Sequence, residues 1–325
     1  MLKEDNNLVF KVKKTNELSE EELDQLLNLI RSTMNVERTK KKFKDKYLKN
    51  FLGYSFHALM IKESTIVGCN TVIPQEFIYF SEKHIFGQWC ETLIDKNFRG
   101  NFSNFKKLGL ILDEILIKHN ISFVYGLPNK SLYVVSKRLL GMKDIGKLNY
   151  YVYPSRMNKF FNRFYPLNII ICFFLKVLLK FKIKFNYDYN FKIHKLNNVN
   201  FFKSRYPDDE NYKHEINDNF KFTYKIETSI KHNNAKIIWI IDIDPLNKSN
   251  LEEAVNNLIK KNYNQDLIIF IGNLKIIPYN LIKIPNKFIE EHNVYSGKII
   301  NNEKIKENIF NSSNWNINSS NFDYK

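Results

Sequence analysis

Two short apolar runs enclose the segment that decides the fold: residues 84–94 read HIFGQWCETLI and residues 121–125 read ISFVY. Both have the length and the β-branched and aromatic content of strands. Between them, apolar side chains recur at the spacing of one helix face. These side chains are Phe105, Leu108, Leu112, Ile115 and Leu116. The sequence therefore predicts a strand, a bend, a helix and a second strand in this order.

The bend between the first strand and the helix combines small polar residues with positive charge. Arg99, Gly100, Asn101 and Ser103 occupy it, and two lysines follow one helical turn later. A helix that begins just after a strand presents free backbone amides and the positive end of its dipole, and both favour an anion. The bend is therefore a candidate phosphate site.

Further elements can be predicted on both sides of this segment. Ser19 and Glu22 form a capping box that opens a helix over residues 23–30. Strands are expected at 8–12, 54–61, 65–69, 77–80 and 145–153, and helices at about 40–50 and at 131–140, the latter ending at Gly141. Short strands joined by polar turns favour an antiparallel meander before the bend.

Four motifs around this segment match one known superfamily. They are Phe98-Arg99-Gly100, FVYGLPN at 123–129, Leu140-Gly141-Met142 and Tyr151-Val152-Tyr153-Pro154. In this order they resemble the GNAT acetyltransferases, and more narrowly the bacterial members found with surface-polysaccharide biosynthesis. Residues 315–317 and 322–323 are similar to the ending of that group. The resemblance implies a GNAT fold over residues 1–155: a mixed α+β or α/β architecture with a mostly antiparallel central sheet flanked by helices.

The resemblance also implies a cosubstrate, acetyl-CoA, and no metal. In that family the amides of the bend wrap the CoA pyrophosphate, the preceding strand holds the thioester carbonyl, and an Asn at the next helix contacts the pantetheine arm. The matching residues are Leu93, Ile94, Arg99, Gly100, Asn101, Phe102, Ser103 and Asn129. Phe102 and Asn104 stand where the family pattern has small residues, which bears on how closely the backbone approaches phosphate.

Glu91 and Tyr133 are the candidate catalytic residues. Glu91 lies in an otherwise apolar strand, where burial raises a carboxyl pKa and suits a general base; the alternative is that it pairs with a lysine. The family's frequent acid position is Lys137 here, and Tyr133 lies one turn earlier on the same helix face. Tyr133 is the candidate acid, with core packing as the alternative. His57 and His84 are interpreted as core or cross-strand residues.

The second half of the chain is predicted to hold a linker and a smaller domain. Residues 156–190 are apolar and basic, and their run at 167–179 is shorter than the ~20 residues of a membrane span. We expect an interdomain helix there, with an interfacial helix on an acidic membrane as the alternative. A strand at 235–242, a helix capped by Ser249 and a strand at 266–271 predict a second, degenerate GNAT-like domain over 191–325.

The amino-acid composition indicates which kinds of partner and which cellular compartment suit the protein. The formal charge is +16 and the pI is 9.4, which favours an anionic partner, although a Lys-, Asn- and Ile-rich composition is also what an AT-rich genome encodes. No nucleic-acid-binding signature is present. Three cysteines without metal or disulfide spacing, and an N-terminus without a signal peptide, favour a cytoplasmic protein, or one peripheral at the inner membrane face.

The predicted function is transfer of an acetyl group from acetyl-CoA to a primary amine of a small-molecule acceptor, by family analogy a nucleotide-linked or lipid-linked amino sugar. The first alternative is a degenerate GNAT fold that serves as a non-catalytic binding or scaffold module. The second is aminoacyl or fatty-acyl transfer at the membrane, suggested by the apolar run at 167–179.

Overall fold

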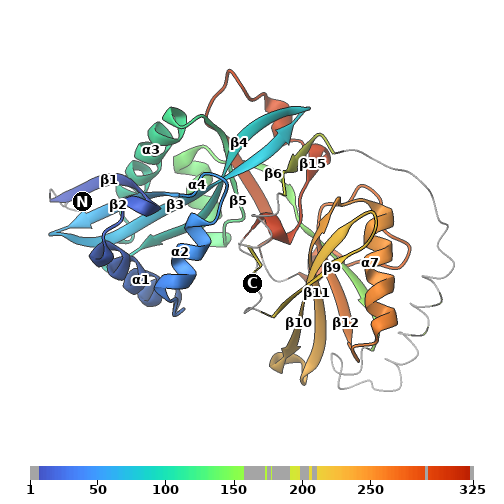
Figure 1. The fold of residues 1–325 in the computed structure, drawn as a ribbon. Coiled ribbons are helices and arrows are strands. Elements are labelled where there is room, and N and C mark those ends of the chain that lie inside the picture. Colours follow the sequence, from blue (N-terminus) through green and yellow to red (C-terminus); the bar gives the residue numbers. More distant parts are fainter. Residues whose placement is uncertain are drawn as a thin grey trace. The chain divides into compact units, whose positions relative to one another are not determined.

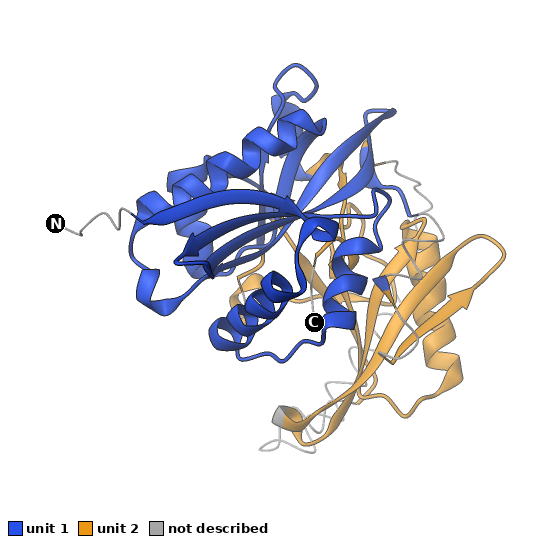
Figure 2. Cartoon of the chain, turned by 60° about the vertical axis from the view of Figure 1, so that its left-hand side comes forward, with its two compact units in different colours: residues 1–146, 193–205, 294–312 blue, residues 147–192, 206–293, 313–325 orange. Residues whose placement is uncertain are grey.

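The computed structural model describes residues 7–156, 173, 177, 191–197, 205–206, 211–289 and 292–322. The chain divides into two compact units, shown in Figure 2. Unit 1 comprises residues 1–146, 193–205 and 294–312, and unit 2 comprises 147–192, 206–293 and 313–325. The predicted boundaries at 155 and 191 therefore differ from this division, in which each unit takes segments from both halves. Nearly all of the predicted linker at 156–190 lies outside the described residues.

Unit 1 contains a mixed sheet whose main path runs in the order β1-β2-β3-β4-β5-β14-β6, with β8 paired to β3. Most neighbouring ladders are antiparallel, whereas β4 and β5 run parallel. The bounds are β1 Leu8–Lys14, β2 Phe56–Lys62, β3 Thr65–Tyr79, β4 Glu82–Ile94, β5 Ile121–Gly126, β6 Lys143–Lys147, β8 Ile193–Lys195 and β14 Val294–Ile299.

Helices cover both faces of the unit 1 sheet, as Figure 1 shows. The helices are α1 Glu20–Met34, α2 Lys40–Leu48, α3 Phe102–Lys118 and α4 Lys130–Leu140. Strand side chains alternate between the two faces: Ala58 and Met60 of β2 pack with α3, whereas Leu59 packs with α1 and α2. The result is a three-layer unit with one apolar core on each side of the sheet.

The local helix signals of the sequence are confirmed. The Ser19 side chain accepts a hydrogen bond from the Glu22 amide and the Glu22 side chain accepts one from the Ser19 amide, so the capping box opens α1. Gly141 ends α4 in the left-handed conformation at φ +71°, which glycine adopts without steric strain.

The meander is simpler than predicted. The expected strands at 65–69 and 77–80 are one continuous strand, β3, through Pro74. A proline removes one ladder donor, which argues against a strand interior. At Pro74, however, β3 pairs with β4 alone, because its ladder with β2 ends at Val72 and its ladder with β8 begins at Phe77. The missing amide therefore need not break a ladder.

The single strand expected at 145–153 is also wrong, because the structure has two strands there. It is divided into β6 and β7 Asn149–Pro154, and the two strands belong to different sheets. In unit 1, β14 from the second half of the chain lies between β5 and β6. In unit 2, β7 pairs with β12 and β13. Each sheet thus takes a strand from the other half of the sequence.

Unit 2 has a sheet in the order β13-β7-β12-β11-β10-β9. Its elements are β9 Tyr212–Ile216, β10 Lys221–Ser229, β11 Ala235–Asp244, α7 Lys248–Lys261, β12 Leu267–Gly272 and β13 Ile282–Lys283. β11 and β12 run parallel and α7 connects them, as the predicted strand, helix and strand require. The helix cap is Asn247 and not Ser249: the Asn247 side chain accepts from the Asn250 amide at 2.8 Å.

Candidate functional site

The parallel ladder between β4 and β5 ends before β4 does. It joins Ile85–Gln88 of β4 to Ile121–Tyr125 of β5, and β4 then continues to Ile94 without a ladder to β5. Gly126 marks the end of the ladder, where a Cβ atom would lie 3.0 Å from the carbonyl oxygen of Trp89. The part of β4 from Trp89 to Ile94, called here the open segment, therefore has one edge outside any described ladder.

A β-bulge lies inside the open segment. Asn70 pairs with Thr92 and Val72 pairs with Trp89, so Cys90 and Glu91 together lie opposite Thr71 alone. A bulge changes the face to which the following side chains point. Trp89 accordingly packs in the core with α3, whereas Leu93 packs with α1 and α2. The bulge thereby points Glu91 to the α1–α2 side.

Glu91 is the centre of a buried ion-pair cluster. Its side chain is 8% exposed, Arg38 Nη1 lies 2.5 Å and Lys46 Nζ lies 3.0 Å from Oε1, and the Tyr47 hydroxyl donates to Oε2. The alternative expectation, pairing with a lysine, is confirmed. Sequence reasoning missed Arg38 and Tyr47, since nothing in their local pattern links them to a strand far along the chain.

The pKa of Glu91 moves in the direction opposite to the prediction. Burial alone raises this pKa, but the charges of Lys46 and Arg38 and the hydrogen bonds from Tyr47 and Arg38 outweigh burial and lower it. Glu91 is therefore ionised and firmly held at neutral pH. A carboxylate with a lowered pKa is a weak base, and the assignment of Glu91 as general base stays a prediction.

His57 lies beside this cluster and is a core residue, as expected. Thr15 Oγ1 lies 2.9 Å from Nε2 and Thr71 Oγ1, opposite the bulge, lies 3.1 Å from Nδ1. The ring packs edge-on against Tyr47 with centroids 5.1 Å apart. Burial lowers the pKa of His57 to about 3, opposed by the charge of Glu91, so the imidazole is neutral.

The predicted phosphate bend follows the open segment. Arg99 Nε donates to the carbonyl oxygen of Ile94 at 2.8 Å, Gly100 has φ +88°, and the Asn101 side chain caps α3 by accepting from the Ser103 amide at 3.1 Å. A Cβ atom at Gly100 would have nothing within 4 Å, so glycine is favoured here because of its positive φ and not because of crowding by other protein atoms. The bend holds the amino end of α3 next to the end of β4.

Phe102 is the first residue of α3 and is 59% exposed. We therefore expect Phe102→Gly to lower the free energy of unfolding by about 1 kcal/mol or less, the helix-propensity cost of glycine, and far less than truncation of a core Phe. Urea unfolding of both proteins measures this difference. A loss above about 3 kcal/mol would contradict the exposed position of Phe102.

The predicted residues of α4 are in place but already have partners. Asn129 caps α4 by accepting from the Leu132 amide at 2.9 Å. The Tyr133 hydroxyl donates to Asp144 at 2.9 Å and lies 3.1 Å from Lys137 Nζ. Tyr133 thus belongs to a polar surface cluster, and its expected alternative, core packing, is wrong.

Topology brings these parts to one end of the sheet. Because β4 and β5 are parallel, the open segment and the start of α3 lie at the same end as Gly126 and the start of α4. The carboxyl ends of parallel strands are the usual ligand side of such a sheet, and two helix amino ends there favour an anion. The arrangement suits a ligand that carries phosphate and also presents a carbonyl to strand amides.

No group of His, Cys, Asp and Glu side chains among the described residues could hold a metal ion. No helix in the described part of the chain is long and apolar enough to cross a membrane.

No family model and no curated protein matches the sequence. Solved structures do match. A conserved protein of unknown function from Enterococcus faecalis V583, a probable N-acyltransferase, has a TM-score of 0.59 at 11% identity over 90% of this chain and 73% of that one.

Two further structures agree with this match. The GCN5-related N-acetyltransferase of Anabaena variabilis has a TM-score of 0.55 at 12% identity over 90% and 73% of the two chains. That of Kribbella flavida has 0.54 at 8% over 91% and 72%. The predicted fold class is confirmed: the chain has the fold of the GCN5-related N-acetyltransferases.

Proposed function

We propose that the chain is an acyl-CoA-dependent N-acyltransferase that uses acetyl-CoA, with its site at the open segment of unit 1. The observation that carries the proposal is the end of the β4–β5 ladder at Gln88, with a bulge and two helix amino ends beside it. The sequence motifs at 98–100 and 123–129 support the same assignment. The residues of the bend fit the cosubstrate, because a Cβ atom at Gly100 would have nothing within 4 Å and the backbone there is open to close approach.

Acetyl-CoA supplies an acyl group on a thioester, which a primary amine accepts with release of the CoA thiol. In this proposal the bend from Arg99 to Ser103 holds the pyrophosphate, and the amides of Leu93 and Ile94 orient the thioester carbonyl. Asn129 lies at the pantetheine arm. Proximity of the two bound reactants supplies much of the acceleration.

The proton of the amine needs an acceptor, and Glu91 and Tyr133 stay the candidates for base and acid. Since Glu91 is held by Arg38 and Lys46, we assign it first a positioning role, namely fixing α2 and the preceding loop to the bulge. Water is then the better acceptor for the amine proton. Tyr133, held by Asp144, is a weak acid candidate, because a thiolate is a good leaving group without help.

The acceptor class rests on the resemblance of the motifs. An amino sugar, linked to a nucleotide or a lipid, is the proposed primary amine, and the place of action is the cytoplasm or the inner face of the membrane. The basic composition of the chain favours contact with such anionic carriers.

We further propose that unit 2 is a degenerate second copy of the same fold. Its strands β9-β10-β11-β12-β7-β13 follow the same plan as β2-β3-β4-β5-β14-β6, with one parallel pair connected by a helix and an antiparallel strand beyond it. The β11–β12 ladder likewise ends at Ile240, while β11 continues to Asp244.

In unit 2, residues of the chain itself occupy the place where β11 extends beyond its ladder with β12. The Ile317 carbonyl accepts from the Asn273 amide at 2.8 Å, the Ser319 hydroxyl donates to the Ile241 carbonyl at 2.9 Å, and Asn318 bonds to Asp242. Residues 318–321 are all buried. The proposed cosubstrate therefore has one site per chain, in unit 1.

The competing candidate is a non-catalytic binding module. Phe102, at the position where the family pattern has glycine, is the observation in its favour, because its side chain stands on the first turn of α3. Because Phe102 is exposed, its ring can rotate away from the bend without disturbing the core, so we favour the enzyme.

Acetyl-CoA binding separates these candidates. At 100 times its dissociation constant, a ligand that binds only the native state adds about 2.7 kcal/mol of stability. We expect millimolar acetyl-CoA to raise the melting temperature. S-acetyl-pantetheine, which keeps the thioester and lacks the pyrophosphate, should raise it far less. An unchanged melting temperature with acetyl-CoA would contradict the proposal and favour the binding module.

A further inference from the structure

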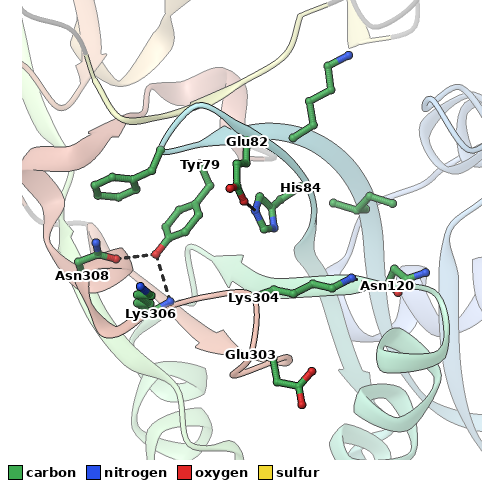
Figure 3. Close-up of a pocket in the computed structure, with 11 residues that line it drawn as sticks. Tyr79, Glu82, His84, Asn120, Glu303, Lys304, Lys306 and Asn308 are labelled. Atoms are coloured by element: carbon green, nitrogen blue, oxygen red, sulfur yellow. Dashed lines mark hydrogen bonds and ion pairs between the residues drawn. The ribbon is translucent and has the colours of Figure 1, made fainter.

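Unit 1 has a pocket of about 810 Å³ at the other end of β4. The turn between β3 and β4, Asn120 before β5, and the loop of residues 303–308 after β14 form its walls (Figure 3). Along β4, Ile85 in the pocket and Glu91 at the bulge are about 20 Å apart at the usual rise per residue. The pocket is therefore separate from the open segment, and its volume is typical of small-molecule sites.

The loop that forms one wall is fixed in place by Tyr79. The Tyr79 hydroxyl donates to Asn308 Oδ1 at 2.6 Å and accepts from the Lys306 amide at 3.1 Å, as the dashed lines in Figure 3 show. Asn120 Oδ1 lies 3.3 Å from Lys304 Nζ. The two lysines are therefore carried by a loop that is tied to β3 at one point and to the start of β5 at another.

The lysines that line the pocket outnumber the carboxylates by one. They are Lys83, Lys304 and Lys306, against Glu82 and Glu303. Within the described part of the chain, neither Lys304 nor Lys306 forms an ion pair, and the Glu303 side chain points away from the other labelled side chains in Figure 3. Two ammonium groups on one fixed loop, facing no carboxylate of their own, form a receptor for an anion.

His84 adds a buried polar atom whose one described contact is an ion pair with an exposed carboxylate. Its side chain is 8% exposed, Nδ1 lies 3.4 Å from Ser122 Oγ, and Nε2 has no hydrogen-bond partner among the described residues. The nearest charged atom is a carboxylate oxygen of Glu82, at 3.5 Å on a side chain that is 81% exposed. A buried polar atom without a hydrogen bond requires an explanation, and a ligand atom in place of the exposed Glu82 carboxylate would supply one.

Tyr79 and Phe80 form an aromatic wall of the pocket, and the backbone of Phe80 has an unfavourable conformation. Phe80 and Ser81 are the two residues of the turn between Tyr79 and Glu82, and their φ angles are +49° and +77°. A bulky residue in the left-handed region is unfavourable by about 1 kcal/mol. Phe80 nevertheless occupies it, packs against Tyr79 with centroids 4.9 Å apart, and lines the pocket. The two-residue turn requires this conformation, and it thereby fixes the position of the Phe80 ring.

From these four features we infer that the pocket binds a phosphate-bearing small molecule with a flat ring, of the size of a nucleotide. The phosphate lies between Lys304 and Lys306, and the ring lies against Phe80 and Tyr79. This site is distinct from the proposed cosubstrate site and does not depend on it.

Methyl NMR of the full chain tests this inference with two reporters on one strand. Ile85 lines the pocket and Ile94 ends the open segment, and each methyl signal is assigned by its loss in the Ile→Val variant. We expect ADP to shift the Ile85 signal, and adenosine or pyrophosphate alone to shift it with at least about tenfold weaker affinity, since each carries half of the contacts. Saturating acetyl-CoA should leave the Ile85 response to ADP in place.

Charge reversal supplies the matched control. The double variant Lys304→Glu and Lys306→Glu should weaken ADP binding at Ile85 at least about tenfold. Lys41→Glu with Lys118→Glu makes the same change in net charge at exposed lysines outside the pocket and should leave the affinity within about twofold. Equal effects of the two double variants, or a shift of Ile94 alone, would overturn the inference. Failure of acetyl-CoA to bind would instead contradict the proposed function and leave the Ile85 test intact.

Discussion

Replacing Glu91 by Gln should destabilise the protein by about 2–4 kcal/mol. Removing one partner of a buried ion pair typically costs about 3–5 kcal/mol, because the remaining charge stays buried and unpaired. The side chains of Arg38 and Lys46 are 18% and 15% exposed, so water relieves part of the cost. Urea unfolding at pH 7 measures the change, with Glu114→Gln on the exposed face of α3 as the control.

The pH dependence identifies the charge of Glu91 as the cause. Its pKa is below the usual 4.5 in the folded protein, so its contribution to stability is complete above about pH 4.5 and is lost as the pH falls through the folded pKa. The difference in stability between wild type and Glu91→Gln should therefore be constant from pH 6 to 7 and shrink below about pH 4.5. A difference that did not depend on pH would show a loss of packing and not of charge.

Turnover then separates the two roles of Glu91. If it only positions the bulge, folded Glu91→Gln should lose about tenfold or less in kcat, with part of the loss in KM. A general base contributes about 100- to 10,000-fold. A fall in kcat of that size, in a variant that still binds acetyl-CoA, would establish Glu91 as the base and contradict the positioning role.

Local signals in the sequence were sufficient for most elements of unit 1. The Ser19 capping box, the helix end at Gly141 and the apolar repeat of α3 each act within a few residues, and each is found in the structure. The bend at 99–103 was predictable because its residues are contiguous.

What could not be predicted depends on distant partners. The exchange of β7 and β14 between the sheets could not be predicted, since no residue pattern within either strand specifies which sheet it joins. The bulge at Cys90–Glu91 is defined by its register against β3. The direction of the Glu91 pKa followed from Arg38, Lys46 and Tyr47, which no spacing rule connects to β4. The burial of Glu91 was inferred correctly, but these three partners outweighed the effect of burial on its pKa.

The second large effect is expected in unit 2, where Asn318→Leu should lower stability by about 2–3 kcal/mol. Asn318 is 3% exposed and its Nδ2 donates to Oδ1 of Asp242, which is 1% exposed, at 3.1 Å. Asp242 also receives hydrogen bonds from the Tyr206 hydroxyl and the Ile243 amide, so the variant removes one donor of several from a buried carboxylate. Loss of such a donor costs about 1–3 kcal/mol, and more for a charged group.

Hydrogen exchange locates this effect. Amides of β11 should exchange faster in Asn318→Leu, because the segment at 317–321 loses its side-chain attachment to this strand. Amides of β12 should follow, since the backbone of the same residue bridges to Gly272, while amides of β2 and β3 should be unchanged. Asn286→Leu, at an exposed position of the same unit, should leave both sets unchanged. An effect spread equally over both units would contradict a local attachment.

The same variant tests the number of cosubstrate sites. If residues 317–321 only complete the core of unit 2, one acetyl-CoA should still bind per chain after the attachment is weakened. The reason is that unit 2 has no equivalent of the bend at 99–103, because β11 leads through Pro245 directly to the cap of α7 at Asn247. Isothermal titration of both proteins gives the stoichiometry. A second equivalent bound by Asn318→Leu would show that this segment closes a working site, and unit 2 would then be a regulated copy and not a degenerate one.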